Sequence, residues 1–120
     1  MDLILWRHAE AEDPRDGQSD LERALTRRGE KQAAKVAAWL DRELPDGTVV
    51  LSSPAVRCEQ TVLALGRKYK VRDALQPGAT VQDVLAAAEW PSAIRPVMIV
   101  GHQPVLGQVI AQLLRIEGGE

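Results

Sequence analysis

Residues 3–10, which read LILWRHAE, place an arginine and a histidine directly after a short apolar run. Four consecutive apolar residues, most of them with branched side chains, are typical of a buried strand in a parallel sheet. We therefore predict a strand over residues 3–6 that delivers Arg7 and His8 at its carboxyl end. A buried strand holds the backbone beneath two such side chains more firmly than a loop does.

Two further runs of the same kind occur at residues 48–51 and 97–100, and each is bounded by Pro, Gly or Ser. We predict both as buried strands, with residues 70–75 as a weaker edge strand. Helical patterns separate the runs. The helices are expected to begin at Thr26, at Ser53 (with Pro54 in the first helical position), at Thr80 and at Pro104.

Strands that alternate with helices predict an α/β fold, a three-layer α/β/α sandwich with a mostly parallel sheet and right-handed crossovers. Length and the absence of a linker favour a single domain over residues 1–120. Residues 9–25 are polar and contain Pro and Gly, so we expect a long loop over the end of the first strand. A loop of that length in a small domain is more often functional than idle.

Composition excludes several classes of function. The formal net charge of −2 provides no general attraction to nucleic acids or membrane surfaces. The chain has no Phe and one Tyr, which disfavours stacking of nucleic-acid bases. No apolar run approaches the length of a membrane span. The single cysteine and the lack of a signal-type segment predict a cytoplasmic protein.

Basic side chains follow all three strongly apolar runs. Arg7 and His8 follow the first, Arg57 lies in the first turn of the helix after the second, and His102 follows the third. Since ligands of a parallel α/β sheet bind outside the carboxyl ends of its strands, these side chains are expected to converge. Arginine matches phosphate oxygens bidentately, and histidine can accept a phosphoryl group or donate to one. The pattern therefore indicates a site for a phosphate-like dianion.

Positive neighbours are expected to keep His8 neutral, which frees a ring nitrogen for attack. Two histidines without a local carboxylate cluster make a poor metal site, and no Gly-rich loop with Lys indicates a nucleoside triphosphate. Cys58 falls on an apolar helix face and is expected to be a core residue.

Four stretches resemble the histidine phosphatase superfamily, which includes the phosphoglycerate mutases. They are MDLILWRHAEAE, RALTRRGEKQA, VVLSSPAVRCEQTV and VMIVGHQPVLGQVI, and they span nearly the whole chain in the order of that family. Within the family, the chain most resembles the short bacterial SixA-type phosphohistidine phosphatases. The resemblance implies a phosphoglycerate mutase-like fold.

The resemblance also implies roles for individual residues. His8 would be the nucleophile, and Arg7, Arg57 and His102 would complete the phosphate pocket. Arg23 resembles an arginine that short members place near the same pocket. No metal and no organic cofactor is implied, and the partner would be a protein that carries phosphohistidine.

Three departures from the family pattern stand out. Ala9 follows the histidine where the family has glycine, and we expect the methyl group to be tolerated. The region LQPGATVQDVL, residues 75–85, lacks the acid that many members carry after a middle strand, which favours phosphohistidine over sugar phosphates. The sequence also stops after the fourth predicted helix, where short members continue through a further strand. It is either a minimal form or cut short.

The preferred interpretation is a metal-independent phosphatase that works through a phosphohistidine intermediate and acts on a phosphorelay or phosphotransfer protein. An alternative is a small-molecule phosphomonoester phosphatase with Glu10, Glu12 or Asp20 as the acid. A non-catalytic phosphate-binding regulatory module and a purely structural domain also stay open. The last of these predicts no affinity for anions.

Overall fold

The computed structural model describes residues 2–117, with the side chains of residues 2–115. Its centre is a four-stranded sheet in the order β1-β4-β2-β3, in which every neighbouring pair is parallel. The strands are β1 (Leu3–Arg7), β2 (Val49–Ser52), β3 (Lys70–Val71) and β4 (Val97–Gly101). The three apolar runs thus form adjacent strands, and β4 lies between the other two.

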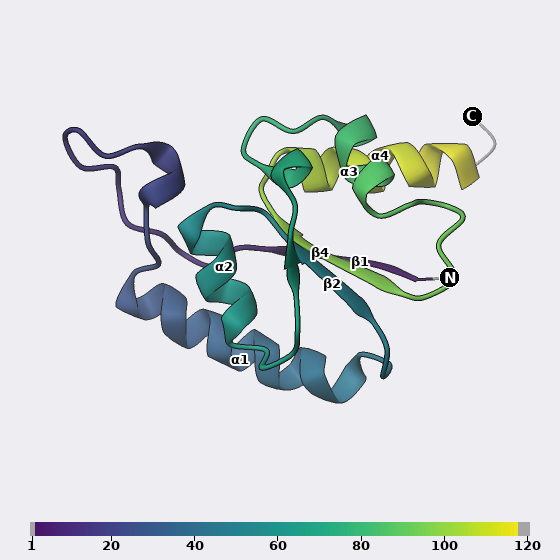
Figure 1. Ribbon diagram of the computed structural model, residues 1–120, viewed down its shortest axis with the longest axis horizontal. Coiled ribbons are helices and arrows are strands. Elements are labelled where there is room, and N and C mark those ends of the chain that lie inside the picture. Colours follow the sequence, from purple (N-terminus) through teal and green to yellow (C-terminus); the bar gives the residue numbers. More distant parts are fainter. Residues whose placement is uncertain (1, 118–120) are drawn as a thin grey trace.

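Helices cover both faces of the sheet (Figure 1). They are α1 (Arg27–Glu43), α2 (Val56–Leu63), α3 (Val81–Ala87) and α4 (Val105–Glu117). The helices α1 and α2 pack on one face around a core that includes Met98 and Val100, and α3 and α4 pack on the other around Ile99. The predicted three-layer α/β/α sandwich with a parallel sheet is therefore confirmed.

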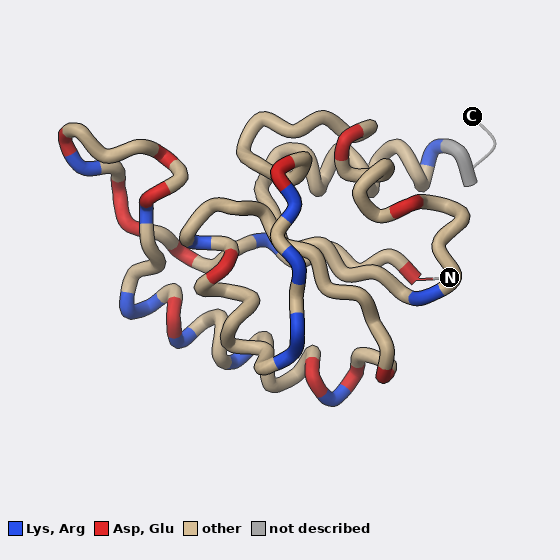
Figure 2. The backbone as a smooth tube through the Cα atoms, viewed as in Figure 1, with Lys and Arg blue, Asp and Glu red and all other residues tan. Residues whose placement is uncertain are grey.

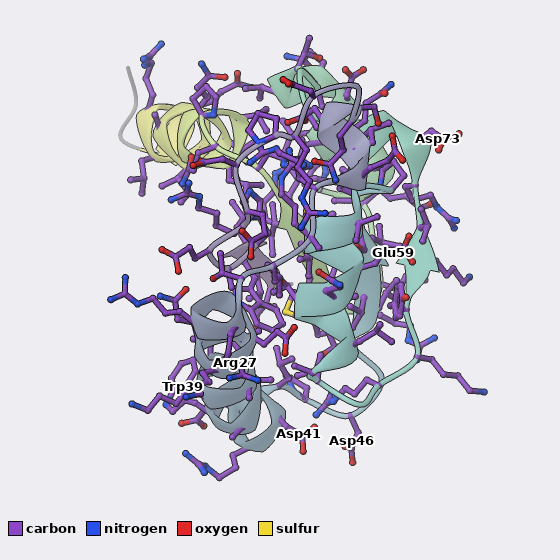
Figure 3. The ribbon with its side chains drawn as sticks, turned by 90° about the vertical axis from the view of Figure 1, so that its left-hand side faces the viewer. Arg27, Trp39, Asp41, Asp46, Glu59 and Asp73 are labelled. Atoms are coloured by element: carbon purple, nitrogen blue, oxygen red, sulfur yellow. The ribbon has the colours of Figure 1, made fainter. Side chains whose placement is uncertain are left out.

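Two helix starts lie where the sequence predicts them. The hydroxyl of Thr26 accepts a hydrogen bond from the backbone of Gly29, and the hydroxyl of Thr80 accepts one from the backbone of Asp83. Each cap satisfies a backbone donor that the first helical turn leaves free. The inner side of α1 buries Ala37, whereas Trp39 projects from its outer side (Figure 3) and is 53% exposed.

Two predicted elements differ in the structure. Ser53 is not a helix cap, because α2 begins at Val56 and its N-cap residue Ala55 makes no side-chain cap bond. Ser53 instead stays beside the sheet, where its backbone donates to Val100. The edge strand predicted over residues 70–75 is confined to β3, since a 3₁₀ helix η2 (Asp73–Leu75) follows and buries Leu75.

The long loop after β1 leaves and re-enters the domain through a short antiparallel stem, in which Glu12 donates to Ala24 and Thr26 donates to Glu10. Beyond the stem, the chain projects from one end of the molecule and carries a 3₁₀ helix, η1 (Asp20–Glu22) (Figure 1). Acidic residues outnumber basic ones along this projection (Figure 2). The stem approaches α1 so closely that Gly29 touches the carbonyl oxygen of Glu10.

None of the helices within residues 2–117 combines the length and the apolar character that crossing a bilayer requires.

Candidate functional site

The pairing of β1 with β4 brings the two histidines together. Arg7 pairs in register with Gly101, and the backbone of His8 donates to the carbonyl oxygen of Gly101. The residues that follow these strands are therefore side by side. The rings of His8 and His102 lie 5.3 Å apart between centroids, in an edge-to-face arrangement.

Arg57 projects from the first turn of α2 between the two histidines, and its residue is only 3% exposed. Its Nε atom lies 3.3 Å from Nε2 of His8, and one terminal nitrogen lies 3.4 Å from Nδ1 of His102. One edge of the guanidinium thus spans both rings. Because arginine stays charged at any physiological pH, this edge is a fixed, buried source of positive charge.

Hydrogen bonding determines which nitrogen of His8 is free. Its Nδ1 atom lies 2.7 Å from the carbonyl oxygen of Ala9, and since a carbonyl can only accept, Nδ1 carries the proton. The lone pair is therefore on Nε2, which faces Arg57. Burial lowers the pKa of His8, and Arg57, Arg7 and Arg23 lower it further. The expected neutral His8 agrees with this direction, although burial contributes more than the arginines do.

His102 is held neutral by a similar environment. Burial is the largest cause that lowers its pKa to about 4, and the charge of Arg57 adds to the effect. The Nε2 atom lies 2.8 Å from the hydroxyl of Ser53 and 3.5 Å from the thiol of Cys58. Two buried side chains thus contact the far edge of the ring, while Nδ1 faces Arg57.

A cavity of about 580 Å³ opens over this cluster. Arg7, at the exposed end of β1, and Arg23, from the long loop, line it together with His8, His102 and Arg57. All five basic residues singled out by the sequence therefore meet at one site. Such a concentration of fixed donors and positive charge favours a small oxyanion over a neutral or cationic ligand.

The three carboxylates considered as acids lie in different environments. Among the residues that line the cavity in the described part of the chain, Glu10 carries the one carboxylate, and it accepts a hydrogen bond from Thr26. Glu12 and Asp20 do not line it. The wall on the side of η2 is formed by Pro77 and Gly78, without an acid.

The structure accommodates Ala9. Within residues 2–117, Glu89 is the one residue other than glycine with a positive φ, so the backbone at Ala9 needs no left-handed conformation. The amide of Ala9 donates to the hydroxyl of Thr61, which itself donates to the carbonyl of Arg57. This buried threonine ties the segment of His8 to the helical turn of Arg57.

Three residues that contact the site do not emerge as site residues from the sequence. The sequence predicts Ser53 as a helix cap, does not single out Thr61 and offers Asp20 only as an acid. In the structure Ser53 contacts His102, Thr61 joins two segments of the site, and Asp20 binds Arg57. A threonine on the otherwise apolar face of the second predicted helix is the signal that could have indicated Thr61.

Within residues 2–117 no group of three or more His, Cys, Asp and Glu side chains is arranged to hold a metal ion.

Residues 3–79 match the histidine phosphatase superfamily (branch 1). The chain is 30% identical to a phosphohistidine phosphatase SixA homologue of Haemophilus influenzae, over 94% of this chain and 77% of that protein. It also resembles two solved structures. One is a putative phosphohistidine phosphatase SixA from Nakamurella multipartitia, with 36% identity and a TM-score of 0.81, over 94% of this chain and 65% of that one. The other is a protein histidine phosphatase SixA complexed with tungstate, with 30% identity and a TM-score of 0.80, over 94% and 76%.

Proposed function

The chain belongs to the histidine phosphatase superfamily (branch 1), and on that premise we propose that it is a metal-independent phosphatase that removes phosphoryl groups from phosphohistidine on a phosphorelay or phosphotransfer protein. The observation that carries the proposal is the placement of a lone pair on Nε2 of His8, 3.3 Å from the buried guanidinium of Arg57. A nucleophile and a fixed positive charge thus face the same point in the cavity.

The first step is an in-line attack of His8 Nε2 on the substrate phosphorus. The new bond joins Nε2 to phosphorus as the bond between phosphorus and the substrate nitrogen breaks, and the leaving imidazole nitrogen takes a proton from solvent. The Nε–H group of Arg57, which now donates to His8, exchanges that partner for a phosphoryl oxygen. Arg7 and His102 hold further equatorial oxygens, and this fixed charge stabilises the transition state.

Water then attacks the phosphorus of phosphorylated His8. The bond between Nε2 and phosphorus breaks, inorganic phosphate leaves, and His8 regains its lone pair. The hydrogen bond from Nδ1 to Ala9 fixes the ring in both steps, so that the same nitrogen accepts and releases the phosphoryl group.

Two features favour a phosphohistidine substrate. A phosphoramidate leaves more easily than an alkoxide and depends less on a strong acid, and the wall formed by Pro77 and Gly78 offers none. The tungstate complex of the similar SixA structure also supports a site for a tetrahedral oxyanion. We further place the enzyme in the cytoplasm, where reducing conditions suit a chain with one buried cysteine.

Rapid quenching with a labelled phosphohistidine protein tests the proposal. We expect a base-stable, acid-labile phosphoenzyme that disappears in His8→Ala. Retention of the label in that variant would remove His8 from its role. Binding of inorganic phosphate without any turnover would instead indicate a regulatory module.

One observation supports a second candidate, a small-molecule phosphomonoesterase, because Glu10 lines the cavity and could protonate an alkoxide leaving group. Glu10→Gln and Glu12→Gln form a matched pair, since Glu12 lies two residues away outside the cavity lining. Turnover of phosphomonoesters that falls steeply in Glu10→Gln and not in Glu12→Gln would favour this candidate. Equal activity of both variants on phosphohistidine would favour the first.

A further inference from the structure

We infer that Asp20 is a positioning residue, which holds the guanidinium groups of Arg57 and Arg23 so that they face the oxyanion site. The inference rests on the proposed function for the identity of the site, and it assigns a purpose to the long loop after β1. That loop leaves the domain and returns to place η1 against α2.

The contacts of Arg57 divide between two edges of its guanidinium. On the outer edge, NH1 donates to the backbone carbonyl of Asp20 at 2.7 Å and NH2 donates to its carboxylate at 2.9 Å. On the inner edge, Nε and NH2 face His8 and His102. Asp20 therefore binds the outer edge of the Arg57 guanidinium and leaves two N–H donors on the inner edge directed at the histidines. This is the bidentate arrangement that a phosphoryl group requires.

The second oxygen of the same carboxylate orients Arg23. Both Nε and NH2 of Arg23 lie 2.9 Å from Oδ1 of Asp20, while NH1 donates to the carbonyl of Glu12. One carboxylate thus connects two arginines that both line the cavity. Long arginine side chains lose considerable conformational freedom when they are fixed, so an anchor made before substrate binds lowers the cost of binding.

The same contacts argue against Asp20 as the acid of the reaction. Both carboxylate oxygens accept hydrogen bonds from arginine, and the bond from Arg57 is the main cause that lowers the pKa of Asp20 below its usual value. A proton donor needs the opposite shift. Asp20 also does not line the cavity, so its carboxylate does not compete with the substrate for the oxyanion site.

Asp20→Ala and Asp20→Asn test the inference through binding of inorganic phosphate, measured by calorimetry on the whole chain. Loss of the charge-assisted hydrogen bonds is expected to weaken phosphate binding by about tenfold or more in Asp20→Ala, with a smaller loss in the isosteric Asp20→Asn. The side chain of Asp20 is 53% exposed but that of its partner Arg57 is 4% exposed, so both variants are expected to lower the thermal midpoint, and phosphate binding is compared well below the midpoint of each variant.

Added formate distinguishes a positioning role of the carboxylate from a merely structural role of the residue. A small carboxylate that fills the vacated place is expected to restore part of the phosphate affinity of Asp20→Ala. Asp16→Asn is the matched control, because Asp16 is an exposed acid of the same loop and forms no salt bridge or side-chain hydrogen bond with the described residues. Its phosphate affinity should equal that of the parent chain.

Unchanged or tighter phosphate binding in Asp20→Ala would overturn the inference, and so would a loss that formate leaves unrestored. These outcomes are independent of turnover. A parent chain that binds phosphate but forms no phosphoenzyme would refute the proposed function and leave the role of Asp20 intact. If the parent chain forms a phosphoenzyme on His8 and Asp20→Ala binds phosphate as the parent does, the proposed function stands and the role of Asp20 is refuted.

Discussion

The hydroxyl of Ser53 lies 2.8 Å from Nε2 of His102, and both residues are buried. The other ring nitrogen, Nδ1, faces a terminal nitrogen of Arg57, which can only donate. The arrangement therefore favours the tautomer in which Nε2–H donates to Ser53 and Nδ1 accepts from Arg57. A serine hydroxyl can also turn and donate to Nε2, so it can follow a change of tautomer when Nδ1 must donate to a phosphoryl oxygen.

Replacing Ser53 with Ala should disturb His102 in a way that nuclear magnetic resonance can detect. The buried Nε2–H group loses its acceptor, and the alternative tautomer turns a proton toward Arg57. Leaving a buried polar group without a partner costs about 1–3 kcal/mol of stability. We expect the nitrogen-15 chemical shifts of the His102 ring to change and the affinity of the protein for phosphate to fall.

Ser52→Ala is the control for that experiment. Ser52 is buried to the same degree, but its hydroxyl donates to the carbonyl of Ser53 and does not contact His102. Its removal should leave the histidine shifts unchanged. Equal shifts in the parent, Ser52→Ala and Ser53→Ala proteins would contradict the role given to Ser53.

The lowered pKa of His102 predicts that acid destabilises the fold. The unfolded chain takes up a proton near pH 6.5, whereas the folded chain does so at a pKa of about 4. The stabilisation that comes from the neutral His102 is therefore fully present above pH 6.5, and it is lost as the pH falls toward 4. The difference amounts to about 3 kcal/mol. The lowered pKa of His8 acts in the same direction.

Urea unfolding at a series of pH values between 7 and 4.5 measures this dependence. The carboxyl groups of Asp20 and Glu22, whose pKa values are lowered from 3.8 and 4.5, act in the same direction only toward the acid end of this range, so the slope at its upper end reports the histidines. His102→Asn should remove most of the dependence of the free energy of unfolding on pH. A parent protein whose free energy of unfolding stays constant across the window would contradict the prediction.

Much of this site follows from sequence because parallel strands bring their carboxyl ends to one edge. The apolar runs that became β1 and β4 predict the meeting of His8 and His102. The first helical turn after β2 likewise predicts the approach of Arg57. Periodicity and a parallel sheet are enough to predict these contacts, since each of these residues lies within a few residues of a regular element.

The role of Asp20 does not follow from sequence in the same way. It lies in a polar loop without periodicity, and its partner Arg57 is 37 residues away along the chain. The position of Ser53 differs from the prediction for a related reason. Serine before proline is an ordinary helix start, and the contact that overrides this preference comes from β4 through His102.

Cys58 is predicted to be unreactive in the folded protein. It is fully buried, and burial raises the pKa of its thiol to about 12, so almost no thiolate exists near neutral pH. A chromogenic disulfide reagent should therefore label the native protein far more slowly than the same chain in denaturant. The sequence contains one cysteine, so the signal has a single source. Rapid labelling under native conditions would show that the thiol is accessible.

Gly29 is predicted to be required for the close contact between α1 and the loop after β1. A Cβ atom at this position would overlap the backbone carbonyl of Glu10, which cannot move without displacing the segment that follows His8. We expect Gly29→Ala to destabilise the protein by about 1–3 kcal/mol in urea unfolding, as overpacking of a tight contact does.

Gly107→Ala is the comparison for this variant. Gly107 lies inside α4, and an added Cβ there approaches the end of the Gln103 side chain, whose oxygen accepts a hydrogen bond from the backbone of Gly107 and would have to shift slightly. Because alanine is about 1 kcal/mol more favourable than glycine inside a helix, this gain should offset the cost of that shift, and the variant should stay close to the parent in stability. Of these two glycine-to-alanine changes in helices, only Gly29→Ala is thus expected to lower the stability clearly. Equal effects would mean that the contact between Gly29 and Glu10 does not fix the loop that leads from His8 to Asp20.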